Sequence, residues 1–366
     1  MNGKKLTEAY TRCREMISQL GEEIPESFYF IQLPKMVEAT SKIVERISDK
    51  DLLEMKEMDE RLSISIHFYC LMGCASFFGK PEMLPFIASR IVQLTMKNGL
   101  CIYSIIGFVH YAMVLLSSNN AKNVESASRI GKAAMSCFRE RYNTTNMLPF
   151  LYSVYYGHIA FHTEPLHACT DMLRQGFDAG MSLGELGPAF YNAIHHIKTA
   201  VVAGDMLPSL LEKVDYYLEQ ANTYQNEIAK AYLSIFRGTV STLIDKRQST
   251  RLSPLAIDIP TDTANAHLLE SINFHRVVQA YWQGYSERCQ HYIGKLPEKS
   301  SNSGGKLNSV IIVFIHGMNS FRLMKKQPTH KLRSISKNSI RVLKTAAKHS
   351  CWNFLNKVRY NQPVSV

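Results

Sequence analysis

Two stretches within Lys80–Asp205 share one plan, and this plan constrains the fold more than any other feature of the chain. Each stretch opens with an acidic residue beside a proline, at Pro81-Glu82 and at Glu164-Pro165. Each then continues as an amphipathic helical pattern that a glycine, Gly99 or Gly180, is expected to end, and a more apolar helix follows. Because the two glycines stand 81 residues apart, the chain has room for two helical hairpins of about 40 residues each.

The rest of the chain carries further helical patterns. The only stretch that alternates like a strand is Val310–Ile315, which is also apolar enough for a buried helix. Gly204 is expected to end one helix and Asp205 to cap the next. About fifteen helices in succession, joined by short loops, are typical of a stacked array whose hairpins bury their apolar faces only against one another. The predicted fold class is therefore all-α, an α-solenoid of TPR-like antiparallel helix hairpins.

The domain boundaries follow from composition. Residues 1–299 are predicted to form the TPR-like helical repeat array. The Ser- and Gly-rich stretch at residues 300–306 is predicted to be a flexible break. Residues 307–366 are predicted to be basic C-terminal helices that complete or cap the array.

The net charge of +11 belongs to the end of the chain. From Ser301 onward there are 12 Lys and Arg and no Asp or Glu, so residues 1–300 carry a net charge of −1. Five of these side chains fall on one face of a predicted helix: Arg333, Lys337, Arg341, Lys344 and Lys348. Such a face suits either a neighbouring domain, an acidic partner protein, an anionic membrane surface or a nucleic acid. Nucleic acid is the least favoured of these, because no aromatic residues are interleaved with the charges.

One segment is apolar enough to be considered as a membrane span, Leu100–Leu116. Its 17 residues are at the lower limit for crossing a bilayer, and His110 lies within it. A helix buried on most sides in a helical array has the same pattern, so a buried helix is predicted and no transmembrane segment is expected. No signal peptide is expected at the start of the chain.

The eight cysteines are spread singly along apolar faces: Cys13, Cys70, Cys74, Cys101, Cys137, Cys169, Cys289 and Cys351. Cys70 and Cys74 lie one helical turn apart, without the second pair or the nearby histidine that a zinc site needs. Buried free thiols are therefore expected, which indicates a reducing compartment and predicts a cytoplasmic protein.

Several signatures resemble the helical-repeat region of very large signalling proteins. They stand at Tyr10–Pro25, Phe77–Leu100, His162–Ala193, Ala203–Asp205 and Leu343–Val358. In that family a Ser/Thr-kinase-like domain is followed by an AAA-type predicted ATPase, a TPR-like array, a GAF domain and often a histidine kinase. The resemblance implies a non-catalytic array that binds proteins or relays between ATPase and kinase modules.

Motifs for chemistry are weak by comparison. No phosphate-binding loop of the GxxxxGK[ST] type is present. His158 and His162 have the i, i+4 spacing of zinc ligands, with Glu164, His167 and the pair His195-His196 in the same region. Histidines satisfied between helices are the favoured interpretation.

The segment Val310–Met318 is superficially similar to the strand and His-Gly of an α/β-hydrolase, but the G-x-S-x-G elbow is missing. A repeat helix is the favoured interpretation. A hydrolase using His316 or the His195-His196 pair remains a minor alternative.

The sequence therefore predicts a protein-interaction scaffold and not an enzyme. The partner is expected to bind in a groove lined by the first helices of successive hairpins. We predict no catalytic residue, no cofactor and no metal. The alternative is a fragment of a larger ATPase and histidine-kinase protein whose chemistry lies outside this chain. Tyrosines are expected to line the groove or to pack between helices: Tyr103, Tyr111, Tyr152, Tyr155, Tyr156 and Tyr191.

Overall fold

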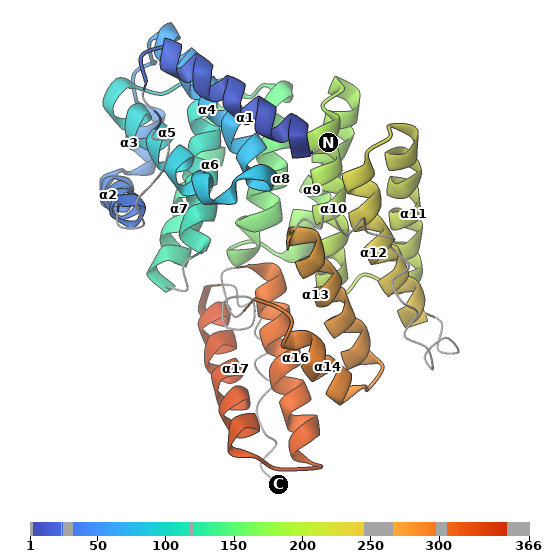
Figure 1. The fold of residues 1–366 in the computed structure, drawn as a ribbon. Helices are drawn as coiled ribbons and strands as arrows, with labels where there is room; N and C mark the ends of the chain where they lie inside the picture. The colour runs from blue at the N-terminus through green and yellow to red at the C-terminus, as the bar shows by residue number, and fades with distance from the viewer. Residues whose placement is uncertain are drawn as a thin grey trace. The chain divides into compact units, whose positions relative to one another are not determined.

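A computed structural model describes residues 3–22, 24, 32–117, 121–244, 266–297 and 306–349. Every regular element in these residues is helical, and the one β-type contact is an isolated bridge between Glu57 and Leu100 (Figure 1). The predicted all-α class is confirmed. The predicted break at residues 300–306 lies outside the described residues except for Lys306.

The chain divides into two compact units, Met1–Met147 and Leu148–Val366. The helices of the first unit are α1 (Gly3–Gln19), α2 (Gln32–Arg46), α3 (Asp49–Leu53), α4 (Glu60–Gly79), η1 (Pro81–Met83), α5 (Leu84–Asn98), α6 (Ile102–Leu116), α7 (Ala121–Cys137), η2 (Phe138–Tyr142) and η3 (Thr145–Met147). Those of the second unit are α8 (Leu148–His158), η4 (Ala160–His162), α9 (Leu166–Leu183), α10 (Leu186–Ala203), α11 (Leu207–Thr223), α12 (Glu227–Ile244), α13 (Ala266–Trp282), α14 (Ser286–Ile293), α16 (Leu307–Met324) and α17 (His330–His349). Of these, α14 was not foreseen from the sequence.

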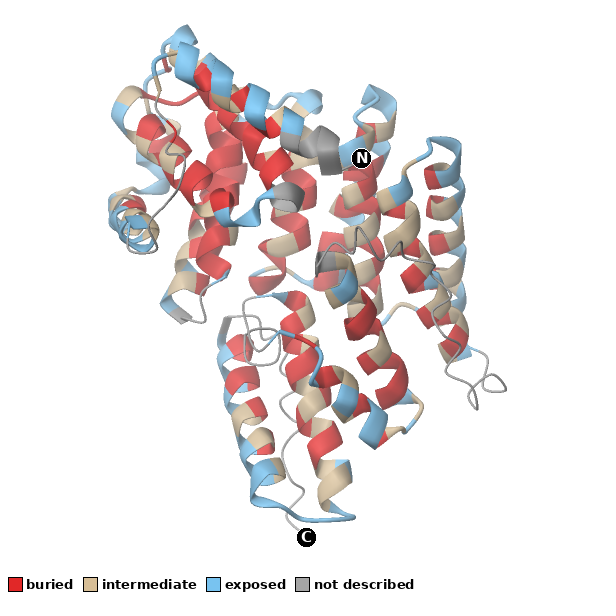
Figure 2. Cartoon of the chain, viewed as in Figure 1, coloured by how far each residue is buried: buried red, intermediate tan, exposed pale blue. Residues whose placement is uncertain are grey.

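Helix α6 forms the centre of the first unit. It packs against α4, α5 and α7, and most of its residues are buried, as the red ribbon of Figure 2 shows. Phe108 and Tyr111 are among the largest fully buried side chains. The apolar segment predicted to be a buried helix is therefore a core helix of this unit.

Residues 54–59 link α3 to α4 and cross the start of α6 as a short extended segment, which we call the strap. The Leu100 amide donates to the Lys56 carbonyl at 2.8 Å, and the Met58 amide donates to the Leu100 carbonyl at 2.9 Å. Gly99, which ends α5 as predicted, has φ 115° and faces the strap. A Cβ atom there would lie 2.5 Å from the Lys56 oxygen. Gly99 is therefore needed both for its left-handed backbone and for the close approach of the strap.

In the second unit the helices pack in chain order. Helix α10 contacts α8, α9, α11 and α12, and α12 in turn contacts α13. Farther along, α13 and α14 both contact α16, which pairs with α17. The Val310–Ile315 run lies inside α16 and is helical, as the repeat-helix interpretation predicted.

Gly180 does not end α9, contrary to the prediction. The helix continues to Leu183, and Gly184 ends it with φ 73°. The Glu185 amide donates back to the Gly180 carbonyl at 2.8 Å, which is the bond that closes a Schellman motif. Gly180 is instead a close-packing residue, because a Cβ atom there would lie 2.8 Å from the Ala189 Cβ of α10.

The boundary between α10 and α11 is only partly as predicted. Gly204 ends α10 with φ 92°. Asp205 does not cap α11, whose N-cap is Met206 with no side-chain hydrogen bond. The Asp205 carboxylate instead accepts a hydrogen bond of 2.7 Å from the ammonium of Lys213, a residue of α11.

Candidate functional site

The structure separates the histidines that the sequence suggested as a metal pair. Helix α8 ends at His158, and His162 belongs to the short helix η4 that follows. His158 instead lies against His195 of α10, with ring centroids 4.5 Å apart and an edge-to-face orientation. Within the described residues, no group of three or more His, Cys, Asp and Glu side chains is placed to hold a metal ion.

The neighbouring histidines His195 and His196 face different surroundings. His196 is buried, and its Nδ1 lies 2.6 Å from the Tyr217 hydroxyl of α11. Burial lowers the pKa of His196 to about 4. His196 is therefore neutral at pH 7 and joins α10 to α11 by a buried hydrogen bond. This arrangement is that of a histidine satisfied between helices.

His195 belongs to a second polar group, which also contains His158 and Lys198. The Lys198 ammonium nitrogen lies 2.8 Å from His195 Nδ1 and 3.1 Å from the Gly157 carbonyl oxygen. Gly157 leaves room for the imidazole, because a Cβ atom there would lie 2.8 Å from the His195 ring. The helices α8 and α10 thus bring these groups together at a close crossing. We call His158, His195 and Lys198 the lysine–histidine cluster.

The electrostatics of this cluster are unusual. Burial and, to a smaller extent, the positive charge of Lys306 together lower the pKa of Lys198 to about 7. Burial, and then the charge of Lys198, holds the pKa of His195 well below its ordinary value. Sequence reasoning missed Lys198, although it is the only charged residue in α10, which was the available signal.

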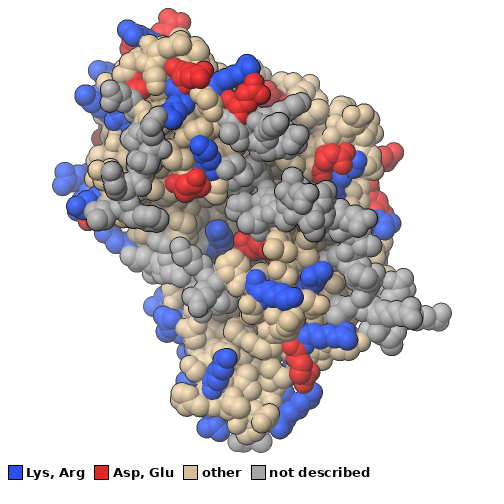
Figure 3. Space-filling view, in the orientation of Figure 1, with Lys and Arg blue, Asp and Glu red and all other residues tan. Residues whose placement is uncertain are grey.

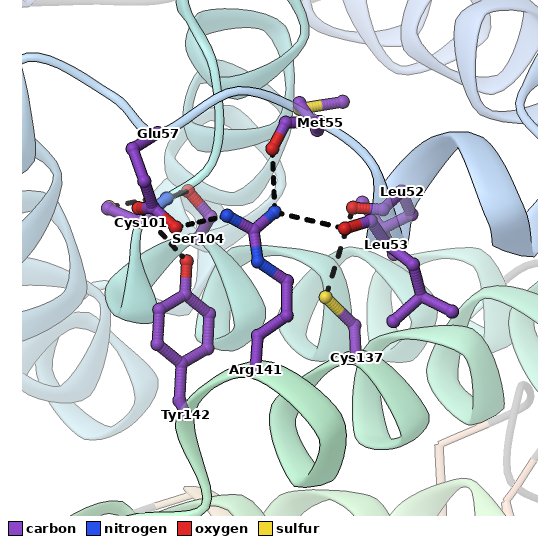
Figure 4. A network of polar contacts seen from close by, with 9 residues as sticks. All are labelled: Leu52, Leu53, Met55, Glu57, Cys101, Ser104, Cys137, Arg141 and Tyr142. Carbon is purple, nitrogen blue, oxygen red and sulfur yellow. Dashed lines mark hydrogen bonds and ion pairs between the residues drawn. The ribbon is translucent and has the colours of Figure 1, made fainter.

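A second polar network lies in the first unit, around Arg141 (Figure 4). Its guanidinium donates to the Met55 carbonyl at 2.7 Å, to the Leu53 carbonyl at 3.3 Å and to the Glu57 carboxylate. Cys137 adds a weak hydrogen bond to the Leu52 carbonyl. These bonds fasten the end of α3 and the strap that follows it to the end of α7 and to η2. The network is structural, since the guanidinium is occupied by groups of the strap itself.

The cysteines of the described residues are free thiols, as expected, and most are buried. Burial raises the pKa of Cys74 and of Cys169 to about 12. Thiols of this kind are poor nucleophiles and poor metal ligands at neutral pH. Cys351 lies outside the described residues.

The six tyrosines were expected to line a groove or to pack between helices, and most of them pack between helices. Tyr111 donates to the Val37 carbonyl at 2.7 Å, and Tyr155 donates to Glu164 at 3.0 Å. Tyr152 and Tyr156 are buried, whereas Tyr191 is half-buried. Tyr103 is half-buried and stacks on the His67 ring, with centroids 4.1 Å apart. More exposed aromatic side chains occur on other elements, at Tyr216, Tyr224 and Trp282.

Helix α17 presents the predicted row of cations. Arg333, Lys337, Arg341, Lys344 and Lys348 are all exposed. The opposite side of the helix, which includes Val342, Leu343 and Ala346, is buried, and α16 is its neighbour. Figure 3 shows blue Lys and Arg side chains with little red over this region. The apolar side is therefore already used in the fold, and the exposed side offers charge alone.

Among the described helices, α16 has the length and apolar character of a membrane span, whereas the segment suggested by the sequence, Leu100–Leu116, does not. In the described part of the chain, Leu307–Met324 is the one helix long and apolar enough to cross a bilayer, and half of it is buried inside the protein. Ile102–Leu116 is apolar but shorter. A core helix of a folded domain passes the same test.

No protein-family model matches the chain, and comparisons with curated proteins and with solved structures also find no match.

Proposed function

We propose that this chain is a protein-interaction scaffold built as an α-solenoid of TPR-like hairpins. The observation that carries the proposal is the pattern of helix contacts. Helices α8, α10 and α12 contact one another in turn, while α9 pairs with α8 and α10, and α11 pairs with α10 and α12. The same alternation occurs in the first unit, where α4 contacts α6 and α5 lies against both. Alternating inner and outer helices are the contact pattern of repeat arrays.

The polar side chains support a scaffold better than an enzyme. His196 and His275 are buried between helices, and the Arg141 network fastens a strap. His316, suggested as a hydrolase residue, lies inside α16 with its Nε2 3.3 Å from the Gln290 amide nitrogen. These groups are used to hold helices together. In the described residues the hydrogen-bonding neighbour of His316 is an amide and that of His196 is a buried tyrosine, so neither imidazole has the serine or cysteine nucleophile that a hydrolase needs.

We propose that the partner presents an acidic protein surface to α17. The exposed residues of α17 include six cations, Lys331 and the five of the predicted row, and no carboxylate. Charge complementarity of this kind guides association and orientation. An amphipathic helix that inserts into a membrane needs an exposed apolar face. In α17 that face is buried, which favours a protein partner over insertion into lipid.

The resemblance to the repeat region of large signalling proteins supports a signalling setting, in which such an array relays between an ATPase and a kinase module. The free cysteines support a reducing compartment such as the cytoplasm. An in-frame phosphate-binding loop upstream of the gene, or a histidine-kinase region downstream, would favour the alternative of a longer polypeptide.

Quantitative affinity capture with the full chain tests the proposal. The variant Arg333→Glu/Lys337→Glu/Arg341→Glu reverses the exposed row of α17. A matched control, Arg12→Glu/Lys50→Glu/Arg174→Glu, makes the same change of charge at helix faces where each cation already has an acidic neighbour at i±4. We expect an acidic partner that binds the wild type and the control but not the α17 variant. Equal capture by all three chains would refute the proposed surface.

A further inference from the structure

The lysine–histidine cluster surrounds an amine with neutral acceptors. The Lys198 amine has two neighbours at hydrogen-bonding distance, the Gly157 carbonyl and His195 Nδ1. No carboxylate of the described residues forms an ion pair with it. The charge that acts on its pKa is the cation of Lys306, the N-cap residue of α16. As whole residues Lys198, His195 and His158 are each half-buried, so their outer parts reach the solvent, whereas the Lys198 amine and the His195 ring are withdrawn from it.

This placement disfavours the ammonium form of Lys198. A buried cation is costly unless an anion pairs with it, and a second cation adds to the cost. The Gly157 carbonyl and His195 can accept hydrogen bonds from the neutral amine nearly as well as from the ammonium. His195 keeps its acceptor nitrogen because burial holds the imidazole neutral. Burial and the charge of Lys306 accordingly lower the pKa of Lys198 to about 7. Desolvation and a neighbouring cation are the two means by which proteins activate lysine as a nucleophile.

We propose that Lys198 is a nucleophilic amine that captures a small aldehyde as an imine. The carbonyl compound would enter from the solvent-facing side of the cluster. The product is a stoichiometric covalent adduct, which is independent of the scaffold function and does not require the chain to turn over a substrate.

The reaction needs no co-reactant. The lone pair of the Lys198 amine attacks the carbonyl carbon, the C–N bond forms, and the C=O π electrons move to oxygen. His195 Nδ1, already 2.8 Å from the nitrogen, accepts the proton that the nitrogen releases. His195 returns that proton to the alkoxide oxygen, which gives the carbinolamine. The second nitrogen proton then passes to the carbinolamine hydroxyl, and this oxygen leaves as water while the C=N bond forms.

The expected rate follows from the fraction of free amine. At pH 7 about half of Lys198 is neutral, whereas a lysine of ordinary pKa near 10.4 is neutral in only about 1 molecule in 2,500. Nucleophilicity falls with pKa, and a slope of about 0.45, as for thiols, costs roughly 30-fold. The net advantage of Lys198 is therefore about 40-fold in rate.

Reductive alkylation of the full chain with limiting formaldehyde and cyanoborohydride at pH 7 tests the proposal. Mass spectrometry of tryptic peptides gives the rate at each lysine. Lys213 and Lys230 are internal controls, because their side chains are 36% and 31% exposed and each is paired with a carboxylate. We expect Lys198 to react tens of times faster than either, and to lose this advantage when the chain is unfolded in urea.

A rate at Lys198 equal to or below that of the two controls in the folded chain would overturn the proposal. The variant His195→Gln, with its fold checked by circular dichroism, tests the role of the imidazole. Glutamine keeps a hydrogen-bond acceptor but cannot take up the proton. We expect a slower reaction at Lys198 with Lys213 unchanged, and an undiminished rate at Lys198 would refute the part assigned to His195.

Discussion

The replacement His275→Gln should make the protein less sensitive to acid. His275 is buried in α13, with its Nδ1 3.0 Å from the Thr239 hydroxyl of α12. Its ring also packs edge-to-face on Phe236, with centroids 4.4 Å apart. Burial lowers the pKa of His275 to about 3, well below the value near 6.5 of a histidine in the unfolded chain.

The sign of the effect follows from proton binding. Between pH 6.5 and pH 3 the unfolded chain binds a proton at this position and the folded chain does not. The stability contributed by the neutral imidazole is thus present above pH 6.5 and is lost progressively as the pH falls. Each pH unit costs about 1.4 kcal/mol of unfolding free energy, or about 2 kcal/mol between pH 7 and pH 5.

Glutamine keeps a polar group near Thr239 and removes the titration. At pH 7 the variant should be less stable than the wild type by about 1–3 kcal/mol, because the imidazole no longer packs on Phe236. At pH 5 the difference in unfolding free energy between wild type and variant should be smaller by about 2 kcal/mol, because only the wild type carries this acid-sensitive group. The measurement is urea unfolding of both chains at pH 7, 6 and 5, followed by circular dichroism.

His330→Gln is the matched control. His330 is exposed at the start of α17, so its replacement removes no buried imidazole. This variant should keep the acid sensitivity of the wild type. A gap between wild type and His275→Gln that is the same at all three pH values would refute the reasoning.

Three further predictions concern packing, the strap and the thiols. Gly107→Ala should destabilise the first unit by about 1–3 kcal/mol in thermal unfolding, because the new Cβ would lie 2.7 Å from the Ile91 Cβ. The control Gly187→Ala should be neutral or stabilising in the same assay, because its Cβ meets no atom within 4 Å. Arg141→Met should leave the strap carbonyls and Glu57 without their donor, which we expect to cost about 2–4 kcal/mol and to speed hydrogen exchange at the Met58 amide. Iodoacetamide should alkylate Cys169 at least tenfold more slowly in the folded chain than in urea, because burial raises the pKa of that thiol to about 12. Equal rates in the two conditions would contradict the burial of Cys169.

Much of the fold could be predicted because helical periodicity is a local property of the sequence. The apolar run around Phe108 identified α6, and Gly99 and Gly204 were correctly placed at helix ends. Gly180 was misassigned because a glycine that ends a helix and a glycine that faces another helix look alike in sequence. Only the Ala189 backbone on the facing helix distinguishes the two.

The polar groups were less predictable, because they depend on which helices meet. The i, i+4 spacing joined His158 to His162, whereas the fold ends α8 after His158 and places that ring against His195. Lys198 stood out only as a lone charge in an apolar helix. Its environment is created by α8, forty residues earlier in the chain, and by Lys306, and neither can be inferred from local pattern.

Hydrogen exchange of the full chain, alone and with the captured partner, tests the scaffold proposal most directly. A partner held by charge on α17 and by the inner helices should slow exchange in residues 330–349 and in α8, α10 and α12, and raising the salt concentration should reduce this protection first at α17. Protection that is absent from α17 and from all three inner helices would contradict the proposal.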